Sequence, residues 1–336
     1  MIVSSDPACK RSAMPSRSRV GLATFALLLF GFTAPKPVAV EAKASSLVAE
    51  DVTGSVLALV GDLVPDSGAP GGGLGNADAV HDLMVSHRPA AYLHLGDLQY
   101  ECGDLANFLE NYDFIWGDKF NDIYPVIGNH EYCNGSHPNA EGYFTYFGAR
   151  ARPSGASYYS FNVLLPTGGH WHVVVLNSNC SEWAPAPGCG LTQAMENWLR
   201  ADLAADNALC DLAVWHEPAF GTNVPFGQKT EMRIPWWTLE ERGVDLIMTG
   251  HSHRYERFRR MIHTGAANNT KGISSTIIGV GGKSHTAFVG PFAPNSVAHY
   301  DDFYGFVKLV LRADGWTQAF KTTDGRSLDA VSIGCH

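Results

Sequence analysis

The stretch "TGHSHRYERF", residues 249–258, places His251 and His253 one residue apart, directly after the apolar run "VDLIM" (244–248). Residues two apart share a face of an extended chain, so a strand that ends here could aim both imidazole rings to the same side. Two solvated loop histidines would give the same pattern in a chain that contains 14 histidines. The rest of the sequence has to distinguish a paired site from a loop.

Four other short apolar runs are followed by residues of the same kinds, namely glycine, aspartate, asparagine or histidine. They are "VLALVGD" (56–62), "AYLHLGD" (91–97), "IYPVIGNH" (123–130) and "LAVWHEP" (212–218). Helix-like segments lie among them at 76–87, 104–116, 191–205 and 234–242. Strands that alternate with helices predict a sheet with helical cover. A second sheet, stacked on the first, is predicted by runs at 157–163, 171–178 and 275–282 and by a hairpin that turns at "ADG" within 304–323.

The polar residues that end these runs are of the kinds that bind metal ions. They are Asp62, Asp97, Asn129, His130, His216, His251 and His253. In α/β sheets, ligands collect beyond the carboxyl ends of the strands, so five strand ends would bring these groups to one crevice. Oxygen and nitrogen donors without thiolates suit iron, zinc and manganese. The donors are too many for one tetrahedral ion, and they fit two ions that share a bridging carboxylate.

Taken in order, "GD…GDLQY…GNHE…WH…GHSH" resembles the five-block signature of calcineurin-like metallophosphoesterases. Within that superfamily the chain is most similar to purple acid phosphatases. The motifs extend from Val56 to about Arg257, and the strand pattern extends over most of the chain. The resemblance implies a four-layer α/β/β/α sandwich of two mixed β-sheets, in a catalytic domain that covers residues 55–336.

The resemblance also implies how the ligands divide between two metal ions. The first ion, expected to be Fe(III), would be held by Asp62, Asp97, Tyr100 and His253. The second ion, expected to be zinc, iron or manganese(II), would be held by Asp97, Asn129, His216 and His251. Tyr100 matches the tyrosinate that distinguishes purple acid phosphatases, and a hard, highly charged ion favours phenolate. The alternative for Tyr100 is an aromatic ring that packs beside the loop.

His130 would not bind metal in such a site. Beside Asn129 it would contact the phosphate and protonate the leaving oxygen, which an imidazole can do below neutral pH. The implied function is an acid phosphatase-like hydrolysis of small-molecule phosphomonoesters by a metal-bridging or metal-bound hydroxide. Two alternatives stay open: a phosphodiesterase or nucleotide hydrolase on the same centre, and a catalytically silent metal-binding protein.

Several positions depart from the family pattern or lie beside it. Val64 stands where many relatives have a histidine ligand and where purple acid phosphatases usually have glycine. Glu217 stands where some relatives have a second histidine, and an extra carboxylate there could repel an anionic substrate. Arg254 and Arg257 could reach the phosphate or could pair with nearby acids. His94 alternates within a strand and is expected to be a core histidine.

The first 44 residues read as a secretory signal peptide, followed by a linker at 45–54. Basic residues precede an apolar run at 20–32, and Ala42-Lys43-Ala44 is a plausible cleavage site. This segment carries six basic and two acidic residues, so its removal would take the net charge from −9 to −13. The acidic balance argues against nucleic-acid binding. We therefore expect a secreted or periplasmic protein with no stable membrane insertion after cleavage.

Six cysteines remain beyond residue 44, and an even number in an exported chain predicts disulfides. Six cysteines allow 15 complete pairings. We expect Cys180–Cys189, because these residues bracket a short Pro/Gly loop, and Cys102–Cys133, because these follow two of the site loops. That leaves Cys210–Cys335 to tie down the C-terminus. A cysteine zinc site is not expected, since the chain has no CxxC pair.

Overall fold

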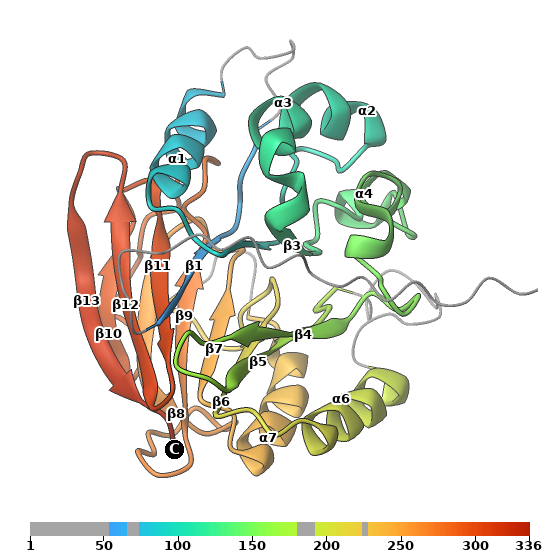
Figure 1. Ribbon diagram of the computed structural model, residues 1–336. Coiled ribbons are helices and arrows are strands. Elements are labelled where there is room, and N and C mark those ends of the chain that lie inside the picture. Colours follow the sequence, from blue (N-terminus) through green and yellow to red (C-terminus); the bar gives the residue numbers. More distant parts are fainter. Residues whose placement is uncertain (1–53, 66–73, 180–191, 224–227) are drawn as a thin grey trace, which may run out of the picture. The chain divides into compact units, whose positions relative to one another are not determined.

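β1 (Ser55–Val60) lies inside a six-stranded mixed sheet in the computed structural model of the chain (Figure 1). The strand order is β13 (Ser327–Gly334), β12 (Gly315–Thr322), β11 (Gly305–Arg312), β1, β2 (Ala91–Leu95) and β3 (Ile123–Val126). β1, β2 and β3 are parallel neighbours, whereas β11, β12 and β13 are antiparallel to their neighbours. The three strands that lead to Asp62, Asp97 and Asn129 therefore end at the same edge.

A seven-stranded mixed sheet carries the remaining strand ends. Its order is β10 (Ser296–Tyr300), β8 (Tyr255–Met261), β9 (Ile273–Ile278), β7 (Leu246–Thr249), β6 (Cys210–Val214), β5 (His170–Val175) and β4 (Tyr159–Leu164). β5, β6, β7 and β9 run parallel, and the outer strands are antiparallel. The structure describes residues 54–65, 74–179, 192–223 and 228–336, which all belong to one compact unit, Ser46–His336.

Side chains of the second sheet alternate between two apolar clusters. Val173 and Val175 belong to the cluster that also contains Leu57 and Leu59 of the first sheet, whereas Val174 belongs to a cluster with the helices. The same alternation continues along β6 and β7. Because both faces of these parallel strands are buried, their sequences are continuous apolar runs and do not alternate with polar residues.

Helices cover the outer face of each sheet (Figure 1). α1 (Gly75–Ser86) contacts β11 and α3 (Asp113–Trp116) on the side of the first sheet. α6 (Gln193–Ala205) and α7 (Arg233–Arg242) contact each other on the side of the second sheet. The arrangement confirms the expected α/β/β/α sandwich of two mixed sheets.

The helix ends follow local chemistry. The Thr192 hydroxyl accepts a hydrogen bond from the Met195 amide at 3.3 Å and caps α6, and α7 ends at Gly243, whose φ is 76°. The helix expected at 104–116 is divided into α2 (Leu105–Asn107), a π-helical turn at Phe108–Tyr112 and α3. The other short helices are α4 (Glu141–Phe147) and 3₁₀ turns at Gly117–Asp122, Cys133–Gly135, Gly148–Arg150 and Thr230–Met232.

Three strands have no counterpart among those expected from the sequence: β8, β10 and β13. β8 reads "YERFRRM", which is rich in charged residues, and two of these side chains, Glu256 and Arg257, have partners across the fold. Arg257 donates to both carboxylate oxygens of Asp329 on β13, at 2.5 and 2.7 Å. β13 is an outer strand with half-exposed residues, so its apolar signal is weak. None of the described helices is long and apolar enough to cross a membrane.

Two of the three expected disulfides are present. Cys102 is bonded to Cys133, and Cys210 at the start of β6 is bonded to Cys335. The second bond fastens the C-terminus, as expected. Cys180 and Cys189 lie outside the described residues, as do the expected signal peptide and most of the linker, and these stay predictions.

α6 is held to β4 and β5, at one end of the second sheet, by a cluster of histidine and aspartate side chains. His172 on β5 contacts Asp202 on α6 at 2.8 Å, and His170 contacts Asp206 at 2.8 Å. Ser160 on β4 also donates to Asp202, at 2.8 Å. Burial opposes protonation of His172, but the Asp202 carboxylate outweighs it and raises the pKa of the imidazole.

We expect Asp202→Asn to lower the free energy of unfolding by about 1 kcal/mol at about pH 5 and by less at about pH 9. The pKa of His172 is higher in the folded than in the unfolded chain, so this contribution is complete below the unfolded value and fades as pH rises through the folded one. Urea denaturation at both pH values measures it. Asp122→Asn, at an exposed position, is the control, and an equal loss at both pH values would contradict the prediction.

Candidate metal centre

The polar residues that follow the strands converge at one edge of the sandwich. Four of them have left-handed backbone conformations that side chains other than glycine rarely adopt: φ is 63° at Asp62, 51° at Asp97, 73° at His251 and 44° at His253. Such conformations cost of order 1–3 kcal/mol each and persist where the surrounding structure demands them. Their concentration in residues singled out for their chemistry points to a functional site.

Asp62, Asp97 and His253 form one group, with the side-chain atoms of all three within 4.8 Å of one another. The Tyr100 hydroxyl lies at the centre, 2.8 Å from Asp62 Oδ1, 3.0 Å from Asp97 Oδ2 and 3.0 Å from His253 Nε2. A phenol has one proton, so at most one of these contacts is a hydrogen bond that it donates. The remaining acceptor atoms lie close together, and a cation between them would relieve their electrostatic repulsion.

Asp97, His216 and His251 form a second group of the same kind. His216 Nε2 lies 3.1 Å from Asp97 Oδ2 and 3.1 Å from Asn129 Oδ1, and His251 Nδ1 lies 3.0 Å from Asn129 Oδ1. The structure therefore brings together all seven residues that the sequence indicated as ligands. Asp97 belongs to both groups, whereas His251 and His253 belong to different ones.

The Nδ1 atoms of His216 and His253 fix the orientation of their rings. His216 Nδ1 lies 2.8 Å from the Leu95 carbonyl oxygen, and His253 Nδ1 lies 2.9 Å from that of Ser284. A carbonyl only accepts hydrogen bonds, so each Nδ1 carries the proton and each Nε2 faces the carboxylates. This is the usual second contact of a histidine that binds metal, and it makes these residues fit for cations.

Electrostatics within the second group depend on Asp97. Burial opposes a charge on His216, but the Asp97 carboxylate prevails and raises the pKa of the imidazole to about 10. Burial and the charge on His216 together lower the pKa of His251 to about 3. Burial acts against ionisation of Asp97, yet His216 and His130 hold the pKa of the carboxyl well below its usual range. Without a cation, His216 would keep a proton that metal binding has to displace.

Glycines at the strand ends let the backbone approach these side chains. A Cβ on Gly96 would lie 2.5 Å from His216 Nδ1, and one on Gly128 would lie 2.2 Å from Asp97 Oδ1. A Cβ on Gly250 would lie 2.9 Å from Asp62 Oδ2. The glycine that precedes the polar residue in three of the motifs is therefore required for close contact between neighbouring loops.

Glu131 supports two loops of the site through hydrogen bonds. The sequence reasoning missed this role, although the residue lies inside the "GNHE" motif. Its fully buried carboxylate accepts hydrogen bonds from the amides of Gly128 at 2.6 Å, Leu98 at 2.8 Å and Asp97 at 3.0 Å. It therefore joins the loop after β2 to the loop after β3. Burial and the neighbouring Asp97 raise the pKa of Glu131 to about 7, which cations bound beside Asp97 would counteract.

The segment "GVGGKS" (279–284) after β9 is a second contact that sequence reasoning missed. The carbonyl of Ser284 orients His253, and the amide of Lys283 donates to the Asp62 carbonyl at 3.1 Å. A Cβ on Gly279 would lie 2.8 Å from Asp62 Oδ2. The closely spaced glycines that follow a buried strand are the sequence feature that could have predicted this close approach of the backbone.

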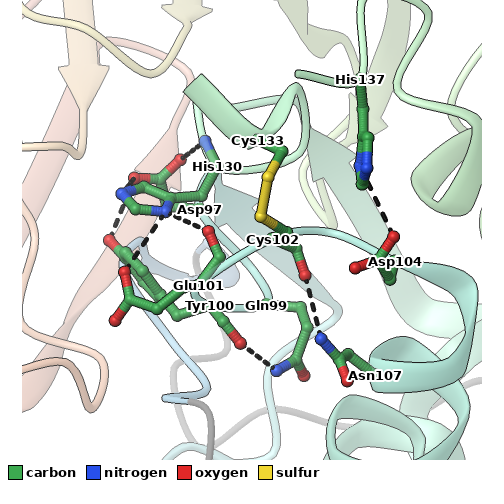
Figure 2. The surroundings of a disulfide bond; sticks show 10 residues. All are labelled: Asp97, Gln99, Tyr100, Glu101, Cys102, Asp104, Asn107, His130, Cys133 and His137. Carbon is green, nitrogen blue, oxygen red and sulfur yellow. Dashed lines mark hydrogen bonds and ion pairs between the residues drawn. A yellow bond between two sulfur atoms is a disulfide. The ribbon is translucent and has the colours of Figure 1, made fainter. Parts of the chain in front are cut away.

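His130 lies beside Asp97, Tyr100 and Glu101 (Figure 2). Its Nδ1 is 2.6 Å from the carbonyl oxygen of Glu101, which must accept, so the proton on Nδ1 is engaged there. Its Nε2 lies 3.9 Å from Asp97 Oδ2 and faces the metal-binding groups. The Cys102–Cys133 disulfide joins the loop that carries Tyr100 to the loop that carries His130 (Figure 2).

The positions that depart from the family pattern are also accounted for. Val64 is buried, and its amide and carbonyl pair with Leu98 and Tyr100, which places Tyr100 beside Asp62. The Glu217 carboxylate lies 3.6 Å from the ammonium of buried Lys229, so its charge is offset.

Arg254, Arg257 and His94 have contacts elsewhere in the fold. Arg254 is buried over the ring of Phe288, 4.2 Å from its centroid, and donates to backbone carbonyls, whereas Arg257 pairs with Asp329. Neither arginine is a phosphate ligand in this arrangement. His94 is a core residue, 2.7 Å from the Tyr112 hydroxyl.

Comparison with known proteins decides the family. The sequence pattern of the calcineurin-like phosphoesterase family matches residues 56–255. The chain belongs to this family. It is thus a metal-dependent phosphoesterase that acts on phosphate esters, and the family depends on a dinuclear metal centre. No curated protein sequence matches the chain.

Solved structures share the fold at low sequence identity. GAP50, the anchor in the inner membrane complex of Plasmodium, is 14% identical with a TM-score of 0.64, over 84% of this chain and 90% of that one. A purple acid phosphatase from yellow lupin seeds is 18% identical with a TM-score of 0.59, over 83% of this chain and 53% of that one. A dimetal phosphatase from Danio rerio is 14% identical with a TM-score of 0.56, over 84% of this chain and 100% of that one.

We expect Glu131→Gln to lower the free energy of unfolding by about 2 kcal/mol, because its NH₂ group would face backbone amides that need an acceptor. Metal affinity should fall about 10- to 100-fold, since the Asp97 loop loses its support. Urea denaturation and metal titration measure the two effects. Glu110→Gln, on an exposed helical face, is the matched control. Wild-type metal affinity in the Glu131 variant would refute the role assigned to this residue.

Proposed function

We propose that this protein is a binuclear-metal phosphatase that hydrolyses phosphomonoesters. The first ion would be held by Asp62, Asp97, Tyr100 and His253, and the second by Asp97, Asn129, His216 and His251. The observation that carries the proposal is the position of Asp97, whose carboxylate belongs to both groups of donors. A shared carboxylate is the arrangement that two adjacent cations require.

Two cations in these positions would clamp a phosphoryl group, activate water and supply positive charge to an acidic protein. The donor sets differ between the two groups, because only the first includes a phenol. The hydroxyl of Tyr100 lies within 3.0 Å of three donors of that group, so a hard ion such as Fe(III) suits it. The second group, with two imidazoles and an amide oxygen, suits zinc, iron or manganese in the divalent state.

His130 is the proposed proton donor. Its Nδ1 proton is engaged by the Glu101 carbonyl, so Nε2 is the atom that would hold the proton for the leaving oxygen. The ring packs against Tyr100, with centroids 4.2 Å apart, and its side chain is 16% exposed. This position fixes the ring beside the donor groups and still leaves it accessible to a substrate. Because Nδ1 already carries a proton, a proton on Nε2 makes the ring an imidazolium, which is the form that can donate.

Export from the cytoplasm is part of the proposal. Two disulfides are formed within the described residues, which fits an oxidising, extracellular or periplasmic environment. One of them joins the two loops of the site, so oxidation would help to hold the donors in place.

We expect the protein, loaded with iron and zinc, to hydrolyse p-nitrophenyl phosphate faster than bis-p-nitrophenyl phosphate, because a monoester would offer the two metal ions three terminal phosphate oxygens and a diester only two. Release of p-nitrophenolate measures both reactions. A diester preference would move the assignment to a phosphodiesterase. Absence of turnover with both metals bound would support a silent metal-binding protein.

His130→Ala should slow hydrolysis of an alkyl phosphate about 10²- to 10⁴-fold, which is the usual contribution of a general acid. The same variant should slow hydrolysis of p-nitrophenyl phosphate much less, because p-nitrophenolate leaves without a proton. The ratio of the two losses is the measurement. His137→Ala, at a half-exposed position in the following turn, is the control. Equal losses on both substrates would contradict proton donation by His130.

A further inference from the structure

The side chain of Lys283 reaches the metal centre from the glycine-rich segment after β9, and it has no part in the proposed reaction. Its ammonium lies 4.3 Å from the centroid of the Tyr100 ring. A cation over an aromatic face is attracted by the electron density of the ring. The side chain is only 18% exposed, so this contact is sheltered from solvent.

The same ammonium forms an ion pair with the Glu101 carboxylate. Glu101 follows Tyr100 directly in the chain, and its backbone carbonyl accepts the Nδ1 proton of His130 at 2.6 Å. Its carboxylate also lies 3.8 Å from that nitrogen. Lys283 is therefore one residue away from the proposed proton donor and in direct contact with a proposed metal ligand.

We propose that Lys283 is a positioning residue of the metal centre, which holds the Tyr100 ring directly and the His130 ring through Glu101. The inference rests on the proposed function, because it assumes that Tyr100 binds the first ion and that His130 donates the proton. Lys283 is anchored for this task, since its own amide is bonded to the carbonyl of Asp62 at 3.1 Å. Lys283 thus links its own loop after β9 to the loop after β1 through its backbone amide and to the loop after β2 through its side chain.

The charge of Lys283 has an electronic consequence for Tyr100. A phenolate bound to Fe(III) absorbs visible light by moving electron density from the ring to the metal. An ammonium over the ring stabilises the electrons of the ring more than it stabilises the more distant metal, and so raises the energy of this transition. Removal of the ammonium should move the absorption to longer wavelength, which a purely structural role would not do.

The test compares Lys283→Met, Lys283→Gln, Lys283→Arg and Glu101→Gln with the wild-type protein, each loaded with Fe(III) and zinc. We expect the visible band to move to longer wavelength in the Met and Gln variants and to return in the Arg variant. The Met and Gln variants should also lose about fivefold in kcat for an alkyl phosphate, with KM little changed. Glu101→Gln should lower kcat without moving the band. Lys271→Met, at an exposed position, is the matched control and should change neither.

The outcomes separate this inference from the proposed function. A visible band in the wild-type protein that stays unchanged in both uncharged variants would overturn the role of Lys283 and leave the ligand assignment intact. Absence of a visible band in the iron-loaded wild-type protein would overturn the Tyr100 assignment, and the inference with it. Metal content and circular dichroism establish that each variant is folded and loaded before its spectrum is compared.

Discussion

The Asp97 carboxylate faces tyrosine and histidine groups of both donor sets, and much of the site depends on how it is held. Asp97 follows a buried parallel strand and adopts a left-handed backbone conformation. Its carboxylate accepts a hydrogen bond from the His130 amide at 2.9 Å. Its own amide is bonded to the buried carboxylate of Glu131. Gly128 permits this arrangement, because any side chain there would collide with Asp97. Displacement of this one group would disturb both donor sets together.

The parts of the site that could be predicted are those whose residue type and position are both visible along the chain. Asp62, Asp97, His216 and His251 each follow an apolar run, so the geometry of parallel strands explains why the two aspartates converge at one edge of the first sheet and the two histidines at one edge of the second. Tyr100 was placed by its resemblance to a family motif, and the structure explains its position by the backbone pairing of Val64.

The parts that could not be predicted depend on contacts between distant segments. β8 looks too polar for a strand until Arg257 is matched with Asp329 on β13, some 70 residues later. The roles of Glu131 and of the segment 279–284 lie in backbone hydrogen bonds, which leave little trace in residue type. The division of the helix at 104–116 into α and π turns has no marker in the sequence that we recognise.

The two sheets contribute different kinds of donor. Asp62, Asp97 and Asn129 follow strands of the first sheet, and the histidines follow strands of the second. Cations bound to both would act as braces between the layers, in addition to the packed apolar side chains, the Arg257–Asp329 ion pair and the Cys210–Cys335 disulfide that already join the two sheets. The spacing of those braces is set by the bulk of leucines and valines far from any reacting atom. Imperfect packing of the interior would therefore shift the donors of one sheet relative to those of the other and weaken the binding of both ions.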